Sequence, residues 1–362
     1  MKVLLLANHL RPGGIATYIV NLGQGLERKG VEVIVASRGG EETKRIKTHF
    51  FIPLKTKFIF SPRLSMSYLQ LRSLVQEKKI DLVHANTRIT QFLAFLLNKS
   101  TGIKRVCGFH GFYRPHFFRR LIKLGGDLNI AVSEEVKRHL VADLGFNPAS
   151  IRVVPSGIDI ERWARKEDKA LAQKRLGLEG YPLVGIVARL APEKQHLLLI
   201  EAFSLLLSAY PGAKLVIAGR GREEEKIRRE IKKRSLKDKV YILSDISAED
   251  VLESLDIFVL PSLKEGFGLS VLEAQAKGVA VVCSCVGGLK DIVRQRENGV
   301  FFYENHPQAL KDAILELLQN KDFCEKIKAK AKVILKERFS HLKMAELTLS
   351  VYNEILAKQE GS

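Results

Sequence analysis

Several kinds of residue and segment are scarce in this chain of 362 residues, and each absence removes a class of protein. The only cysteines are Cys107, Cys283, Cys285 and Cys324, and their spacing indicates neither a disulfide framework nor a cysteine metal site. No apolar run approaches the ~18 residues that a transmembrane helix requires. The apolar run after Met1 is too short for a signal peptide and predicts a first strand. We therefore expect a globular protein of a reducing, cytoplasmic compartment.

Charge is distributed unevenly along the chain. The formal net charge is +19; residues 1–165 carry 27 Lys and Arg against 12 Asp and Glu, whereas residues 166–362 carry 32 against 28. A basic first half beside a near-neutral second half indicates an anionic partner for the first half, either a membrane surface, a phosphorylated substrate or nucleic acid. A surface of thermophilic type is the alternative explanation, but it does not account for the asymmetry.

Strand and helix patterns alternate twice along the chain. Apolar segments typical of strands lie in the first half at 3–7, 31–36, 82–85, 106–107 and 128–132. The alternation restarts in the second half, with strands expected at 183–188, 214–218, 240–242, 257–260 and 279–282. Helical patterns separate these segments, so the sequence predicts an α/β fold of two successive Rossmann-like domains with parallel sheets.

The expected domains are residues 1–165, residues 166–339 and a final helix over 340–362. We place the linker in residues 160–180, which are charged and poor in large apolar side chains. One face of the final helix is apolar and needs a surface to cover it, so we expect this helix to return to the first domain. That face carries Leu342, Ala345, Leu349, Tyr352 and Ile355.

A stretch at residues 264–274 places two carboxylates, Glu265 and Glu273, eight residues apart across a Gly-Phe-Gly turn. The turn follows a strand and precedes a helical pattern, so Glu265 comes before the helix and Glu273 lies on its second turn. The backbone N–H groups of residues 268–270 lie between them, an arrangement suited to an anion. Either carboxylate alone would equally suit an ordinary exposed position.

Other motifs of the second domain also follow strands. Arg189 and Lys194 lie five residues apart after the first of these strands and can aim at one point, the guanidinium gripping two phosphate oxygens and the ammonium adding a compact charge. Two solvated surface cations are the alternative. Gly219 and Ile246 follow two further strands and suit nucleotide contacts.

Two motifs follow strands of the first domain. The segment RPGGIATY at residues 11–18 contains a Gly-Gly pair ending in Gly14, which lets the backbone approach a phosphate at a helix N-terminus, although a tight turn explains it equally. His110 lies in the segment GFHGF and could bind a hydroxyl group or transfer a proton. A structural histidine is the alternative. Because ligands of open parallel sheets bind at the carboxyl ends of strands, we expect the two domains to face each other across a cleft.

In this order and combination the motifs resemble those of the family-4 retaining glycosyltransferases, which have the two-domain GT-B fold. The resemblance rests on the Glu265 to Glu273 segment, the Arg189 loop, the Gly-Gly loop, residues 154–159 (VPSGID) and His110, and it covers essentially the whole chain. It implies transfer of a sugar, with retention, from a nucleoside diphosphate sugar to an acceptor hydroxyl. The second domain would bind the donor.

The resemblance also implies roles for individual residues. Glu273 would bind the ribose of the donor, and Arg189 and Lys194 its diphosphate. Glu265 would contact the transferred sugar near the reacting carbon, and His110 would approach that sugar from the other domain. Further hydrogen bonds to sugar or phosphate would come from Gly14, Gly268, Leu269 and Ser270.

No Asp-x-Asp pair occurs that could hold a divalent metal against a diphosphate. The charge of the leaving group would therefore be met by the two cations and a helix dipole. We expect metal-independent catalysis, and no cofactor besides the nucleoside diphosphate sugar as co-substrate. The usual family glycine before the arginine is Ala188 here, which leaves the phosphate role intact.

Residues 108–124 interleave aromatic side chains with Arg114, Arg119, Arg120 and Lys123, a pattern typical of interfacial segments that bind anionic lipids. It favours a lipid-linked or phosphorylated saccharide acceptor, such as a precursor of a cell-envelope glycolipid or polysaccharide. An anionic membrane surface, on the inner face of the cytoplasmic membrane, is a further hypothesis. The alternative is that the aromatics belong to the core. Nucleic acid is disfavoured because no recognised binding module is present.

Two other functions fit the same motifs. The chain could be a GT-B-like nucleotide-sugar epimerase or a nucleotide-sugar binding protein without transfer activity. An epimerase needs acid and base groups placed on the sugar, and only His110 and Glu265 stand out.

Overall fold

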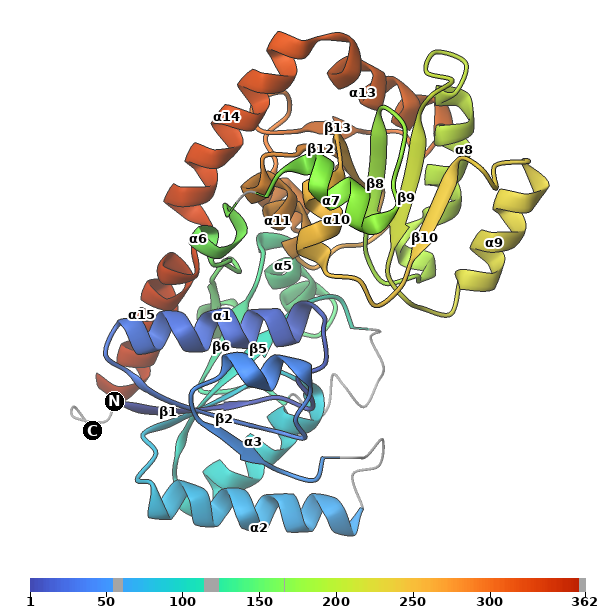
Figure 1. Ribbon diagram of the computed structural model, residues 1–362. Coiled ribbons are helices and arrows are strands. Elements are labelled where there is room, and N and C mark those ends of the chain that lie inside the picture. Colours follow the sequence, from blue (N-terminus) through green and yellow to red (C-terminus); the bar gives the residue numbers. More distant parts are fainter. Residues whose placement is uncertain (55–60, 114–123, 166, 358–362) are drawn as a thin grey trace. The chain divides into compact units, whose positions relative to one another are not determined.

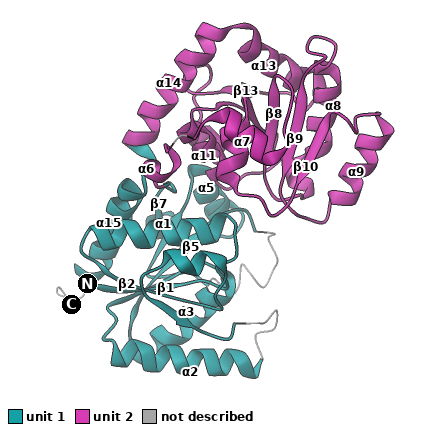
Figure 2. Cartoon of the chain, viewed as in Figure 1, with its two compact units in different colours: residues 1–158, 338–362 teal, residues 159–337 magenta. Residues whose placement is uncertain are grey.

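The chain folds into two units that share one architecture, a parallel sheet packed between helices. The computed structural model describes residues 1–54, 61–113, 124–165 and 167–357 (Figure 1). Unit 1 consists of residues 1–158 and 338–362, and unit 2 of residues 159–337 (Figure 2). Two parallel sheets with helices confirm the predicted α/β class.

The sheet of unit 1 has seven strands in the order β3-β2-β1-β4-β5-β6-β7, all parallel to their neighbours. Residues 3–6 of the central strand β1 are fully buried, because a strand covered on both faces must be apolar throughout. The strands are β1 (Lys2–Leu6), β2 (Glu32–Ser37), β3 (His49–Phe51), β4 (Leu82–Ala85), β5 (Lys104–Phe109), β6 (Leu128–Ala131) and β7 (Ile151–Val153).

The chain leaves β1 towards β2 on one side and later returns to β4 on the other. Parallel crossovers are right-handed, so connections that run in opposite directions along the sheet cover opposite faces. Helix α1, which connects β1 to β2, and helix α3, which connects β4 to β5, therefore lie on opposite faces (Figure 1). Within the described residues, the helices of unit 1 are α1 (Gly14–Arg28), α2 (Pro62–Glu77), α3 (Arg88–Thr101), α5 (Glu134–Ala142) and α15 (His341–Ala357), with short turns η1 (Glu41–Arg45) and η2 (Pro148–Ser150).

The C-terminal helix α15 belongs to unit 1, which confirms that it returns to the first domain. It packs along α1, and Tyr352 is fully buried with its Oη 2.7 Å from Nδ1 of His84. Glu354 accepts a 2.6 Å hydrogen bond from Nη2 of Arg152. Of the apolar face that the sequence predicted, Ala345, Tyr352 and Ile355 are buried, whereas Leu342 and Leu349 are partly exposed.

The sheet of unit 2 repeats the same order with six parallel strands, β10-β9-β8-β11-β12-β13. They are β8 (Leu183–Val187), β9 (Lys214–Ala218), β10 (Val240–Leu243), β11 (Ile257–Leu260), β12 (Ala280–Ser284) and β13 (Val300–Phe302). The helices are α6 (Ile160–Trp163), α7 (Lys169–Leu176), α8 (His196–Leu206), α9 (Glu224–Lys233), α10 (Ala248–Ser254), α11 (Leu269–Lys277), α12 (Leu289–Ile292), α13 (Pro307–Gln319) and α14 (Lys321–Arg338), with the turn η3 (Pro192–Lys194).

The region expected as a linker, residues 160–180, contains α6 and α7 instead. Asp168 caps α7 by accepting a hydrogen bond from the N–H of Ala170, and Lys169 pairs with Asp256. Ala172 is the one buried residue of α7, so the segment has no apolar stripe that the sequence could reveal. The division between the units falls at residues 158–159 and 337–338, rather than at the expected 165–166 and 339–340.

None of the helices in the described ranges is both long and apolar enough to cross a membrane.

Candidate active site

In both sheets, successive strands are added first on one side of the first strand and then on its other side. Such a switch point opens a crevice at the carboxyl ends of the strands. In unit 2 the switch lies between β8 and β11. The loops that leave these two strands comprise residues 188–194 and 261–268, and they contain the predicted cations and the first predicted carboxylate. The N–H of Leu263 donates a 2.8 Å hydrogen bond to the carbonyl of Glu193, which joins the two loops.

Lys194 and Glu265 form an ion pair across this switch point. Their side chains are only 17% and 15% exposed. Ser262, which is buried, donates a 3.3 Å hydrogen bond from Oγ to the same carboxylate oxygen of Glu265. The structure thus brings together the residue predicted for the diphosphate and the residue predicted for the transferred sugar.

Arg189 lies at the same edge of the sheet but is open to solvent. Its guanidinium pairs with Glu193, and its side chain is 71% exposed. Burial alone would raise the pKa of Glu193. Its own backbone N–H and the neighbouring Arg189 together outweigh this effect, so the pKa lies below its ordinary value. The exposed guanidinium can therefore turn from this carboxylate to an anionic ligand.

The helix after this loop, α11, begins without a side-chain cap. Its N-cap is Gly268, and the helix starts at Leu269. Leu269 and Ser270 are partly exposed, whereas Glu273 is only 9% exposed. The first N–H groups of α11 thus lack a capping side chain, which suits an anionic or hydroxyl ligand.

The loops after β9 and β10 continue this edge of the sheet. The N–H of Leu190 donates to the carbonyl of Arg220 at 2.9 Å, and the N–H of Gly219 donates to the carbonyl of Leu243 at 2.9 Å. Arg220 also pairs with Asp245. Ile246 follows in the loop after the edge strand and is 43% exposed.

Three residues near Glu265 are not among those predicted from the sequence, namely Gly287, Gly288 and Ser262. Gly287 and Gly288 follow β12, and the N–H of Gly288 donates a 3.0 Å hydrogen bond to the carbonyl of Glu265. A Gly-Gly pair after a strand is the same signal that singled out Gly14, so this pair could have been found. Ser262 carried no such signal.

In unit 1 the candidate residues lie near the switch between β1 and β4. Gly14 begins α1 next to Gly13, and a Cβ atom at either glycine would meet no described atom within 4 Å, so the space around this turn is open. His110 follows β5 and is half-buried; its Nε2 lies 3.0 Å from Oδ1 of Asn86. The ring of Tyr18 packs against it edge-on, with centroids 4.4 Å apart.

Burial lowers the pKa of His110 to about 4, so its imidazole is neutral at neutral pH. A neutral imidazole can bind a hydroxyl group without adding charge. His110 and Gly14 belong to unit 1 and the remaining predicted site residues to unit 2, so the structure groups them in two sets. Arg114, Arg119, Arg120 and Lys123, predicted to contact lipid, lie outside the described residues.

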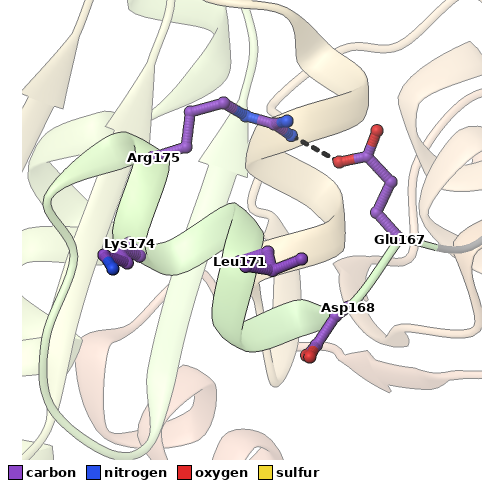
Figure 3. A pocket seen from close by; sticks show the side chains of 5 residues that line it. All are labelled: Glu167, Asp168, Leu171, Lys174 and Arg175. Carbon is purple, nitrogen blue, oxygen red and sulfur yellow. Dashed lines mark hydrogen bonds and ion pairs between the residues drawn. The ribbon is translucent and has the colours of Figure 1, made fainter.

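Unit 2 has a surface hollow whose lining side chains are drawn in Figure 3. It is lined by Glu167, Asp168, Leu171, Lys174 and Arg175, and Arg175 pairs with Glu167 at 2.7 Å. The helix that carries it, α7, starts beside Asp256 at the amino end of β11. The hollow is thus at the opposite end of the strands from the candidate site.

Across the described ranges, no group of three or more His, Cys, Asp or Glu side chains is placed to hold a metal ion.

Two protein families match the chain. The family described as Glycosyltransferase Family 4 matches residues 12–162, and the family described as Glycosyl transferases group 1 matches residues 168–333. These matches cover most of the first and the second half of the chain.

Two named proteins resemble the chain over most of its length. A UDP-Gal:alpha-D-GlcNAc-diphosphoundecaprenol alpha-1,3-galactosyltransferase of Escherichia coli is 28% identical, over 75% of this chain and 75% of that protein. A GDP-mannose-dependent monoacylated alpha-(1-6)-phosphatidylinositol monomannoside mannosyltransferase of Corynebacterium glutamicum is 26% identical, over 88% of this chain and 89% of that protein.

Solved structures match the fold. The crystal structure of HepE from Anabaena in complex with UDP and glucose has a TM-score of 0.86 at 19% identity, covering 98% of this chain and 100% of that one. Such a likeness over the full length establishes the two-unit GT-B architecture. The two family matches, which together span residues 12–162 and 168–333, show that the chain belongs to the group 1, family-4 glycosyltransferases.

Proposed function

We propose that this glycosyltransferase moves a sugar, with retention and without a metal ion, from a nucleoside diphosphate sugar to a hydroxyl of a lipid-linked or phosphorylated saccharide acceptor of the cell envelope. The observation that carries the proposal is the pairing of Lys194 with Glu265 at the switch point of unit 2. A partly buried ammonium requires an anion nearby. A donor bound over this point would place its diphosphate on Lys194 and Arg189 and its sugar beside Glu265.

The donor would be held by the loops of unit 2. Arg189 and Lys194 would neutralise the diphosphate, with the uncapped N–H groups of Gly268 and Leu269 and the hydroxyl of Ser270 adding hydrogen bonds. Glu273 would bind the two ribose hydroxyls. Gly219 and Ile246, in the loops after β9 and β10, would lie next to the nucleoside.

The transfer needs no strong base from the protein. The acceptor oxygen bonds to the anomeric carbon while the bond from that carbon to the phosphate oxygen breaks, and the acceptor proton passes to that phosphate oxygen on the same face. The cations at 189 and 194 stabilise the negative charge that the diphosphate gains. The contribution of the protein is to position the acceptor against the donor and to stabilise the charge of the leaving diphosphate.

The names of the relatives support the substrate classes. The Escherichia coli relative uses UDP-Gal and a diphosphoundecaprenol-linked acceptor, and the Corynebacterium glutamicum relative uses GDP-mannose and a phosphatidylinositol monomannoside. Both acceptors are saccharides on an anionic lipid. A basic first half is what such an acceptor would require.

A panel of UDP, GDP, ADP and dTDP sugars should identify the donor. The matching donor, at about 100 times its Kd, should raise the Tm by at least about 5 °C. Glu273→Ala should remove this rise because the ribose contact is lost, while EDTA should leave turnover unchanged. Loss of turnover on chelation would contradict metal-independent transfer, and conversion of the donor to its epimer without an acceptor would favour the epimerase.

We further propose that unit 1 binds an anionic membrane surface through α2. Met66 and Leu69 are 53% and 60% exposed on this helix, and the exposed Arg63 and Arg72 lie three residues before and after them. At 100° per residue these four side chains fall within half of the helix circumference, with the apolar pair at the centre and a cation on each side. Interfacial helices have this arrangement.

The variant Met66→Gln/Leu69→Gln should weaken binding to vesicles of phosphatidylcholine and phosphatidylglycerol by at least about tenfold, since two apolar side chains no longer enter the lipid. Co-sedimentation measures the bound fraction. The matched control is Leu171→Gln/Leu205→Gln, which replaces two leucines of unit 2 that are 60% and 41% exposed and should bind like the original chain. Equal binding to vesicles of phosphatidylcholine alone would argue against an anionic surface.

A further inference from the structure

Beneath His110 lies a buried amide that the proposed function does not use. Asn86 follows β4 and is fully buried. Its Nδ2 donates a 3.3 Å hydrogen bond to the carbonyl of His84, and its Oδ1 lies 3.0 Å from Nε2 of His110. The side chain therefore has one partner on each end.

These two contacts determine which nitrogen of His110 carries the proton. A carbonyl oxygen only accepts, so the amide nitrogen must face His84 and the amide oxygen must face His110. The amide oxygen also only accepts, so Nε2 of His110 must be protonated. A neutral imidazole has one N–H, which leaves the lone pair on Nδ1. No described residue forms a hydrogen bond with this Nδ1.

The groups around the ring keep it neutral. Tyr18 and His84 face it, from α1 and β4, and Tyr352 of α15 lies behind His84. Burial and the neighbouring His110 lower the pKa of His84 to about 3, and burial raises the pKa values of Tyr18 and Tyr352. At neutral pH the cluster thus holds no charge.

The backbone at Gly108 is shaped around the same atoms. A Cβ atom there would come within 2.7 Å of Oδ1 of Asn86, 3.0 Å of Nε2 of His84 and 3.2 Å of Nε2 of His110. Three polar atoms thus converge where a side chain would otherwise stand. His84 is held in turn by Tyr352, 2.7 Å away, so the C-terminal helix supports the cluster.

We propose that Asn86 is a positioning residue that fixes His110 as the Nε2–H tautomer, so that Nδ1 accepts a hydrogen bond from a hydroxyl of the saccharide substrate. The nature of the substrate rests on the proposed function, whereas the tautomer rests on the geometry alone. A saccharide with a hydroxyl at this position would be accepted. One with a carboxylate there, as in a uronic acid, would place two acceptors against each other and be rejected.

The tautomer can be measured directly in the full-length protein labelled with nitrogen-15 histidine. Two-bond nitrogen–proton correlations distinguish the two neutral tautomers, and comparison with His110→Gln assigns the signal of His110 among the nine histidines. The original chain should show Nε2–H at neutral pH, and Asn86→Leu should show a mixture of tautomers. Asn21→Leu is the control, because Asn21 is equally buried in unit 1 and donates to the carbonyl of Gly157 at 3.0 Å.

Steady-state kinetics of Asn86 variants provide a second test of the proposal. Asn86→Leu should lower kcat by about 10–100-fold, as loss of a partner that orients a ligating histidine does, while KM for the donor changes little. Asn86→Asp keeps an acceptor but adds a charge and should raise the pKa of His110 by about 1–3. Below the raised pKa Nδ1 is protonated and cannot accept, so kcat should fall on the acid side and recover as pH rises.

An Nδ1–H signal in the original chain, or an unchanged tautomer in Asn86→Leu, would overturn the proposal. Absence of sugar transfer would instead count against the proposed function, since the tautomer is read without any substrate.

Discussion

Lys194→Ala should abolish the thermal stabilisation given by the donor and lower kcat/KM by about 10²–10³-fold. The ammonium is proposed to meet the diphosphate as its negative charge grows, and removal of one such stabilising group typically has an effect of this size. Initial rates at several donor concentrations give kcat/KM, and a fluorescence melting curve gives the stabilisation. Lys237→Ala, which removes an exposed lysine of unit 2, should change neither.

Loss of activity in Lys194→Ala has to be separated from loss of structure. Without Lys194 the carboxylate of Glu265, 15% exposed, loses the ion pair that the structure gives it, which should lower the free energy of unfolding by about 1–3 kcal/mol. The double variant Lys194→Met/Glu265→Gln has neither charge and should recover most of that stability while transfer stays lost. A donor that stabilises Lys194→Ala as well as the original chain would refute the diphosphate role.

Much of the fold could be predicted because its strands are buried on both faces. Such strands are nearly continuous apolar runs, as in β1 and β11, and they stand out against the helices between them. The return of α15 to the first domain was predictable because one face of this helix is apolar and has to pack against another part of the chain. By contrast β3 (His49–Phe51) has only three residues, and α7 buries only Ala172. Neither leaves a periodic pattern to recognise.

The candidate site could be predicted only in part. Glycines and charges at the ends of strands pointed to Arg189, Lys194, Glu265 and His110, because parallel strands end at one edge of a sheet. The sequence did not reveal that Lys194 pairs with Glu265, a contact between residues 71 positions apart. Asn86 was missed because its contact with His110, 24 positions further along the chain, has no local signature.

The backbone around Glu265 should be as sensitive to substitution as its side chain. Gly287 has φ of 53°, in the left-handed region, and a Cβ atom there would overlap the carbonyl oxygen of Glu265. The same carbonyl accepts a 3.0 Å hydrogen bond from the N–H of Gly288. An alanine at 287 therefore has to push the Glu265 loop away from β12.

We expect Gly287→Ala to lower kcat by about 100-fold, because a displacement of about 1 Å in a positioning group costs that much. The control is Gly278→Ala. Gly278 has φ of 77°, so alanine meets a similar backbone strain of about 1 kcal/mol there, but its Cβ would be no nearer than 3.5 Å to the closest atom, Cε of Lys332. Both variants should melt at lower temperature, and only Gly287→Ala should lose transfer. If the two lost transfer equally, backbone strain in unit 2 rather than the position of Glu265 would explain the effect; if neither did, the carboxylate would not need the placement that Gly287 gives it.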